Sequence, residues 1–283
     1  MRWLERLAGS RAKGAPSSGP TADIGVEMAH AFEAANRGDY ASALAIWGPL
    51  AQAGVARAQN NVGACFAEGL GVARDTGFAL RWLTLAAQAG DPVGQRNLAA
   101  LYFKGEGVAQ NYARAAELYR MAAEQGDGPA QDMLSWMLLE GEIVPSDSAD
   151  ARRFALAAAE QGIPAAMTRV GMIYHNALGV QRDPAVAAAW WAKAALRGDA
   201  DGQAMLGAAH LLGAGVAPDR IAALAWLLRA KAAGSALAAR FLAQARASLS
   251  AEAIAEAERR AAAPLREIAA RDGPDGIAVE AAP

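Results

Sequence analysis

Apolar residues recur three and four positions apart through most of this chain, the spacing that lines one face of an α-helix. Residues 91–126 show the pattern clearly, with two apolar helical stretches on either side of a glycine-rich loop at 105–108. The first stretch presents Leu98, Leu101 and Tyr102, and the second presents Ala115, Leu118 and Ala122. This segment therefore predicts a helix, a short loop and a second helix.

The predicted helix–loop–helix segment recurs along the chain with a period of 36 residues. A glycine closes each copy, at Gly54, Gly90, Gly126, Gly162, Gly198 and Gly234. Self-similarity at a fixed period of this size is typical of stacked-repeat proteins, in which each repeat packs only on its neighbours. We therefore expect an array of helical repeats rather than two separate globular domains.

A short polar residue precedes the second helix of every repeat, at Asp75, Asn111, Asp147, Asp183 and Asp219. Such a side chain accepts hydrogen bonds from the free N–H groups of a helix N-terminus and suits the helix dipole. The closing glycines suit a left-handed C-cap, which glycine adopts without a side-chain clash. Each loop also holds a valine that we expect to pack into the core: Val72, Val108, Val144, Val180 and Val216.

Large and small residues alternate between the predicted helices, which lets two helices approach closely. We expect one buried column to hold Trp82, Leu118, Phe154, Trp190 and Trp226, and a small-residue column to hold Ala79, Ala115, Ala151, Ala187 and Ala223. One loop departs from the pattern, because Ile143 stands where the other repeats have glycine. A β-branched residue is strained at positive φ, so we expect a distorted loop in the third repeat.

These columns resemble the Sel-one-like repeat, a relative of the tetratricopeptide repeat with the pattern A-x-x-x-L-G-x-x-Y-x-x-G-x-G-V-x-x-D, then A-x-x-W-x-x-x-A-A-x-x-G. The stretch from Ala58 to Gly90 agrees with it at Gly63, Phe66, Gly69, Gly71, Val72, Asp75, Ala79, Trp82, Ala86 and Ala87. Residues 163–198 agree at Gly171, Tyr174, Gly179, Val180, Asp183, Ala187 and Trp190. The resemblance implies an all-α superhelical solenoid of antiparallel helix pairs, of the bacterial type.

The repeats divide the chain into consecutive segments. Residues 22–54 contain a shorter turn at Gly38-Asp39-Tyr40 and predict a tetratricopeptide-like N-terminal capping unit. Five repeats follow at 55–90, 91–126, 127–162, 163–198 and 199–234, and C-terminal capping helices at 235–270. We expect residues 1–21 to form a flexible segment and residues 271–283 a disordered tail.

The composition of the chain bears on the kind of partner that it binds and on its cellular compartment. The formal net charge of −2 gives no electrostatic case for nucleic acid, which favours a basic face. No stretch is apolar for long enough to cross a membrane, and the N-terminus lacks the apolar core of a secretory signal, so we expect a cytoplasmic protein. The single cysteine, Cys65, falls in an apolar column and is interpreted as a buried core residue.

Candidate catalytic and metal-binding groups are sparse. The histidines His30, His175 and His210 belong to no metal-binding motif, and the loop glycines follow no phosphate-binding strand. We therefore expect no cofactor, no metal and no enzymatic activity. One cysteine-rich branch of the resembled family has been linked with penicillin-recognising activity, but this chain lacks those cysteines, which leaves a hydrolase as the least favoured alternative.

In tetratricopeptide-like stacks the first helix of each pair lines the concave side, so the resemblance implies a binding groove there. Helix register places the candidate partner-binding residues in three outward columns: Asn60, Arg96, Asp132 and Thr168; Ala100, Trp136 and Met172; Phe103, Leu139, His175 and Leu211. Large apolar side chains at outward positions usually mark interaction sites. The alternative is that neighbouring repeats bury them.

The sequence therefore predicts a non-enzymatic protein–protein interaction scaffold, expected to be a monomer, that binds a peptide or protein partner in this groove. A second hypothesis is a peripheral membrane adaptor anchored through residues 1–13. There, Trp3, Leu4 and Leu7 share one side of a short basic segment.

Overall fold

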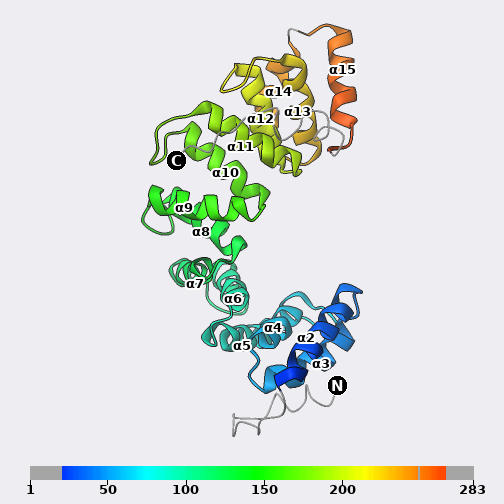
Figure 1. The fold of residues 1–283 in the computed structure, drawn as a ribbon, viewed down its shortest axis with the longest axis vertical. Coiled ribbons are helices and arrows are strands. Elements are labelled where there is room, and N and C mark those ends of the chain that lie inside the picture. The colour runs from blue at the N-terminus through cyan, green and yellow to red at the C-terminus, as the bar shows by residue number, and fades with distance from the viewer. Residues whose placement is uncertain (1–20, 248, 266–283) are drawn as a thin grey trace. The chain divides into compact units, whose positions relative to one another are not determined.

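The computed structural model describes residues 21–265, apart from residue 248 (Figure 1). Within this part of the chain the regular elements are fourteen α-helices, α2 to α15, which follow one another in consecutive antiparallel pairs. The expected all-α fold of helix pairs is therefore confirmed. The tail expected at 271–283 and the N-terminal segment expected at 1–21, apart from Thr21, lie outside the described residues, so the membrane-anchor hypothesis stays a prediction.

The chain divides into two compact units, with the boundary between Ala130 and Gln131 early in α8. The first helices of the pairs are α2 (Thr21–Asn36), α4 (Ala56–Glu68), α6 (Pro92–Lys104), α8 (Gly128–Glu140), α10 (Pro164–His175), α12 (Ala200–Leu212) and α14 (Ala238–Arg246). The second helices are α3 (Tyr40–Gln52), α5 (Thr76–Gln88), α7 (Tyr112–Glu124), α9 (Ser148–Glu160), α11 (Pro184–Leu196) and α13 (Arg220–Ala232). The helix α15 (Ala251–Ala262) ends the described fold. Unit 1 contains α2–α7, and unit 2 contains most of α8 and α9–α15.

The polar residues expected to begin the second helices do cap them. The carboxylate or amide oxygens of Asp39, Asp75, Asn111, Asp147, Asp183 and Asp219 accept backbone N–H bonds of 2.9–3.1 Å. The closing glycines adopt positive φ, between 87° and 91°, as a left-handed C-cap requires. The local signals in the sequence therefore mark the helix ends correctly.

Close approach of paired helices depends on a glycine in the first helix. A Cβ atom on Gly63 would lie 2.8 Å from Leu83 Cγ, and one on Gly171 would lie 2.5 Å from Trp191 Cδ1. The same contact buries Trp191, which is only 1% exposed. The predicted buried column is correct at Trp82, Leu118 and Phe154. It is wrong at Trp190 and Trp226, which are partly exposed, because the buried side chain is that of the next residue, Trp191 on α11 and Leu227 on α13.

The second glycine of each loop packs against the start of the preceding second helix. Gly71 meets Tyr40, Gly107 meets Thr76, Gly179 meets Ser148 and Gly215 meets Pro184. Ile143 does not adopt positive φ, since Ala177, at 57°, is the one non-glycine residue in the described chain that does. The third loop differs from the others in the backbone hydrogen bond that closes it. The distance from Asp147 N to Leu138 O is 3.3 Å, whereas the equivalent bonds of the other four loops measure 2.9–3.1 Å. The third loop therefore differs as expected, but Ile143 avoids the strain; the strained residue is Ala177, which stands where the other repeats have glycine at positive φ, a signal that the sequence reasoning missed.

Buried glutamines link three of the second helices to the next first helix. The side-chain amides of Gln59, Gln95 and Gln203 donate to the carbonyls of Ala51, Ala87 and Ala195, at 3.1–3.4 Å, near the C-terminal ends of α3, α5 and α11. Each of these carbonyls also accepts from the N–H of the closing glycine after its helix, at 3.0–3.1 Å, so the glutamine amide provides a second bond at the helix end. The Oε1 atoms of Gln95 and Gln131 accept bonds of 2.8 Å from Gln125 and Gln161. The Oε1 atoms of Gln59 and Gln203 are buried without a partner, because Ala89 and Ala233 occupy the positions equivalent to Gln125.

Replacing Ala89 by glutamine is expected to stabilise unit 1. The new amide can donate to the buried Oε1 of Gln59 as Gln125 does to Gln95, for a gain of about 0.5–1.5 kcal/mol. Equilibrium urea denaturation would measure the change. Ala89→Glu is the matched control, because a carboxylate has the same length but no N–H to donate. Equal stability of the two variants would contradict this account of the unpaired oxygen.

The C-terminal end of unit 2 is closed by α15, which packs on α13. The Ser250 hydroxyl caps α15 by accepting from Ala253 N at 3.3 Å. Ala225 of α13 and Ala257 of α15 belong to one buried cluster. Arg229 Nη2 donates to the carbonyl of Arg260, at 2.8 Å, and to that of Ala263, so its cation lies at the negative end of α15. Burial lowers the pKa of Arg229 from its usual value.

Candidate interaction surface

The polar column predicted for the groove instead joins consecutive repeats. In unit 1, Asn97 Nδ2 donates to Asn60 Oδ1 at 2.8 Å, and Arg96 Nη1 lies 2.9 Å from Asp127 Oδ2. In unit 2, Arg169 Nη2 lies 3.1 Å from Asp132 Oδ1, and Thr168 Oγ1 donates to Asp199 Oδ1 at 2.6 Å. The outward placement of Asn60 and Thr168 is wrong, because these residues are only 3% and 6% exposed.

The other predicted site residues of unit 1 are Ala100 and Phe103, both partly buried on α6. The Phe103 ring meets the exposed Tyr112 ring edge to face, with centroids 5.1 Å apart. The Phe103 carbonyl accepts from Gln110 Nε2 at 2.9 Å, which holds the loop against the end of α6. Phe103 thus has a local structural partner in Tyr112.

Several predicted site residues of unit 2 contribute to its core. Leu139 and Leu211 are partly buried against hydrophobic clusters, which agrees with the alternative that neighbouring repeats cover such positions. His175 is also partly buried, with its ring 5.3 Å from the Trp191 ring, and its Nδ1 is buried without a hydrogen-bond partner. These three residues flank the outward face rather than forming its centre.

The centre of that face in unit 2 consists of the column that holds Trp136 and Met172, together with two columns that the sequence reasoning missed. One missed column lies four residues after the column of Trp136 and Met172 in the sequence of each first helix. The other missed column lies seven residues before it. We define the unit 2 ridge as Trp136 and Glu140 on α8, Met172 on α10 with the C-cap residue Asn176 that follows it, and Asp201 and Leu212 on α12. Met172 is 40% exposed and Leu212 is 60% exposed, whereas Trp136 is partly buried. Spacings of four and seven residues were the available signal, since they return to one helix face.

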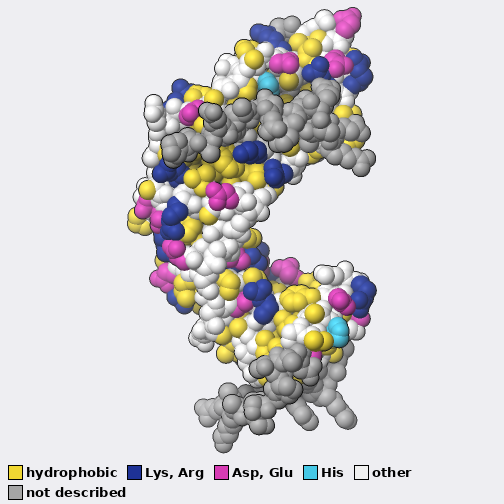
Figure 2. Space-filling model, in the orientation of Figure 1, with side chains coloured by type: hydrophobic (Ala, Val, Ile, Leu, Met, Phe, Trp, Pro, Cys, Tyr) yellow, Lys and Arg dark blue, Asp and Glu magenta, His cyan; other side chains and the backbone are white. Residues whose placement is uncertain are grey.

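The same positions of unit 1 carry different chemistry. Where α8 has Trp136 and Glu140, α4 has Ala64 and Glu68, and α6 has Ala100 and Lys104. At these positions α4 and α6 are therefore small or charged, whereas α2 has Met28 and the 40% exposed Phe32. Figure 2 shows hydrophobic, basic and acidic side chains interspersed on the visible surface, without a large area of one charge sign.

Among the first helices of unit 2, α8, α10 and α12 carry more acidic than basic groups, whereas α14 carries Arg240 and Arg246. The charged residues within the unit 2 part of α8, and within α10 and α12, are Asp132, Glu140, Arg169 and Asp201, besides His175 and His210. The single guanidinium, Arg169, is paired with Asp132. Glu140 and Asp201 are exposed, and the Asp201 carboxylate accepts a 2.6 Å bond from Ser235 Oγ. The unit 2 ridge is thus apolar at its centre and acidic at Glu140 and Asp201.

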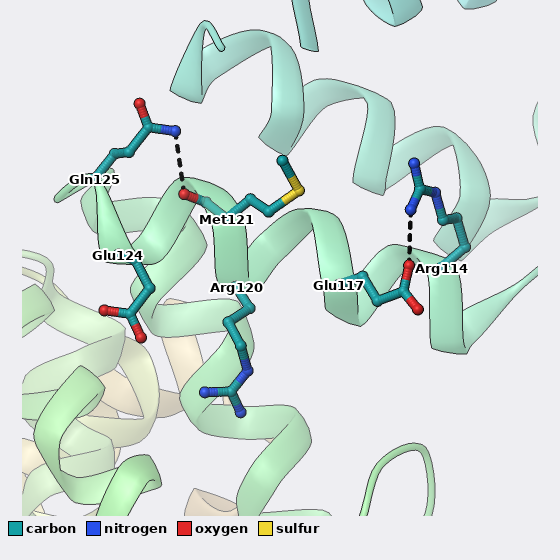
Figure 3. Close-up of a pocket in the computed structure, with 6 residues that line it drawn as sticks. All are labelled: Arg114, Glu117, Arg120, Met121, Glu124 and Gln125. Atoms are coloured by element: carbon teal, nitrogen blue, oxygen red, sulfur yellow. Dashed lines mark hydrogen bonds and ion pairs between the residues drawn. The ribbon is translucent and has the colours of Figure 1, made fainter. Parts of the chain in front are cut away.

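A separate, open hollow in unit 1 is lined by one side of α7 (Figure 3). Its residues are Arg114, Glu117, Arg120, Met121, Glu124 and Gln125. Arg114 pairs with Glu117 at 2.7 Å, and Gln125 Nε2 donates to Met121 O at 3.2 Å. Met121 is 47% exposed beside these charges. This mixed surface presents no nucleophile with an adjacent base, and the sequence reasoning did not single it out.

The described residues provide few of the features that metal binding, thiol chemistry or insertion into a membrane requires. They contain no group of three or more histidine, cysteine or acidic residues placed to hold a metal ion. Burial raises the pKa of the Cys65 thiol to about 11, so the thiol is protonated and inert at neutral pH. None of the described helices combines the length and apolar character that crossing a bilayer requires.

Comparison with known proteins places these observations in a family. Residues 56–91, 92–127, 128–163, 164–199 and 200–235 each match the Sel1 repeat. A Sel1 repeat protein from Oxalobacter formigenes has a similar crystal structure, with 26% identity and a TM-score of 0.73 over 84% of this chain and 97% of that one. The protein c5321, a protective antigen of uropathogenic Escherichia coli strains with an SLR fold, is 28% identical, with a TM-score of 0.78 over 92% of this chain and 57% of its own. No curated protein sequence matches. Because five consecutive matches cover more than half of its residues, the chain belongs to the Sel1 repeat family.

Proposed function

We propose that this protein is a non-enzymatic interaction scaffold whose unit 2 ridge binds a protein or peptide partner. The supporting observation is the exposure of Met172 and Leu212, at 40% and 60%, on neighbouring first helices. Apolar side chains that project from a surface usually mark an interaction site, and a few large residues commonly carry most of the binding free energy. The repeat fold does not need these side chains, since Ala64, Ala100 and Ala208 occupy the repeat position of Met172.

The proposal revises the predicted site. Trp136 and Met172 form its centre, and Leu139, His175 and Leu211 support them from the flanks. Asp132 and Thr168 hold the helices in register, as do Asn60 and Arg96 in unit 1. Ala100 and Phe103 stay predicted contacts of unit 1, and the proposal keeps the cytoplasmic monomer expected from the sequence.

Replacing Met172 by glutamine is expected to lower partner affinity more than tenfold while leaving the fold intact. Glutamine is a good helix former and Met172 is exposed, so circular dichroism should match the parent. A central apolar anchor commonly contributes 2 kcal/mol or more to binding, as an order of magnitude. Quantitative mass spectrometry after affinity capture from native cells would identify the proteins whose recovery falls.

Leu85→Gln is the matched control, because Leu85 is an apolar residue of similar exposure, 45%, on the second helix α5. Proteins lost with Met172→Gln but kept with Leu85→Gln are the expected partners. Equal capture by the parent and both variants would remove the unit 2 ridge as the binding site.

A further inference from the structure

The unit 2 ridge combines apolar anchors with acidic groups that lie on different helices. Trp136 and Met172 occupy the same repeat position on α8 and α10, and Glu140 follows Trp136 by one helical turn. On α12, Asp201 precedes the buried Ala208 by seven residues, and Leu212 follows it by four. Residues four and seven apart share a helix face, so the apolar anchors lie between the two carboxylates.

The charge on this surface favours a basic partner. Glu140 and Asp201 are exposed, while the one guanidinium on the three first helices is paired with Asp132. The nearby loop residue Arg182 donates its Nε–H to the carbonyl of His175 and keeps its positive charge, so the two ridge carboxylates outnumber it two to one. Electrostatic complementarity suppresses partners of the wrong sign and accelerates encounter with the right one. A basic ligand therefore suits the unit 2 ridge better than an acidic one.

The hydrogen-bonding groups beside the ridge favour a helical ligand over an extended one. Backbone groups within α8, α10 and α12 are bonded along their own helices. Nearby polar side chains are already engaged, since Thr168 donates to Asp199 and Asp132 pairs with Arg169. An extended peptide would press unpaired N–H and C=O groups onto an apolar surface, whereas a helix satisfies its own.

We propose that the unit 2 ridge receives a basic amphipathic helix, an inference that rests on the proposed function. Neighbouring helix axes lie about 10 Å apart. A ligand helix that crosses α8 and α10 therefore places apolar residues about seven positions apart on Trp136 and Met172, because it rises about 1.5 Å per residue. Lysine or arginine residues on either side of this apolar stripe meet Glu140 and Asp201.

Fluorescence anisotropy with the full chain tests the proposal using two synthetic helical peptides. Both carry leucines at positions i, i+4, i+7 and i+11, flanked by lysine and arginine in one peptide and by glutamate in the other. The basic peptide is expected to bind at least tenfold more tightly at low salt, and this preference should shrink as added salt screens the charges. Met172→Gln should weaken the basic peptide more than tenfold, and Leu85→Gln should not.

The double variant Glu140→Gln/Asp201→Asn tests the charges separately. It should lose most of the preference for the basic peptide, while Glu68→Gln, at the repeat position of Glu140 on α4, should keep it. Equal binding of the two peptides, both weakened by Met172→Gln, would overturn the basic partner but support the proposed site. Absence of peptide binding, with native capture still dependent on Met172, would overturn the helical partner alone. Peptide binding unaffected by all ridge variants would place the peptide site elsewhere and overturn the inference.

Discussion

Replacing Trp191 by alanine should lower the free energy of unfolding of unit 2 by about 3–5 kcal/mol. The indole is 1% exposed and packs so closely on α10 that a Cβ on Gly171 would lie 2.5 Å from its Cδ1. Its Nε1 also donates to the carbonyl of Thr168 at 3.2 Å. The variant loses this packing and this bond together, and the surrounding helices relax only partly into the cavity.

Trp190→Ala is the matched control, because it removes the same side chain one residue away. Trp190 is partly exposed, with Lys193 Nζ 4.3 Å from its ring centroid, so its loss should cost clearly less. Equilibrium denaturation would give the two free energies, and hydrogen exchange would show where protection falls. Stacked repeats contact only their neighbours, so the loss should centre on α10 and α11. A larger effect of Trp190→Ala would show that the assignment of the buried indole is wrong.

Replacing Gly215 by alanine should destabilise unit 2 by about 2–5 kcal/mol, the sum of backbone strain and overpacking. Gly215 has φ of +78°, a conformation that costs alanine about 1–2 kcal/mol. The added Cβ would also overlap the carbonyl of Pro184 and lie 2.7 Å from Ala185 N. These are backbone atoms at the start of α11, so the loop and the helix would have to separate.

Gly234→Ala separates the two contributions to this expected loss. Gly234 has φ of +91°, but an added Cβ would meet nothing within 4 Å, so only the backbone strain applies. Thermal or urea denaturation should therefore show a clearly smaller loss, about 1–2 kcal/mol. Equal losses in the two variants would mean that close packing between the loop and α11 contributes nothing to stability.

The candidate site was only partly predictable from the sequence, because some predicted residues lie on the outward face and others are buried. Met172 was placed on the outward face and is 40% exposed, because helical periodicity fixes the spacing of residues along one helix. Asn60 and Thr168 were placed there too, although they are buried in contacts with Asn97 and Asp199 of the following repeats. Adjacent columns differ by a fraction of a turn, and packing of the next repeat decides which of them stays exposed.

The sequence by itself determined the period, the helix pairs and the helix ends, because these depend on interactions within a few residues. Asp183, for example, caps α11 through N–H groups two and three residues away. Only the tertiary structure decided which neighbouring residue enters the core or the outward face. Trp191 rather than Trp190 is buried because Gly171 of α10 lies opposite it, and Leu212 stays 60% exposed although α12 packs against α10. Such choices depend on contacts between residues far apart in the chain, which helical periodicity along one helix does not encode.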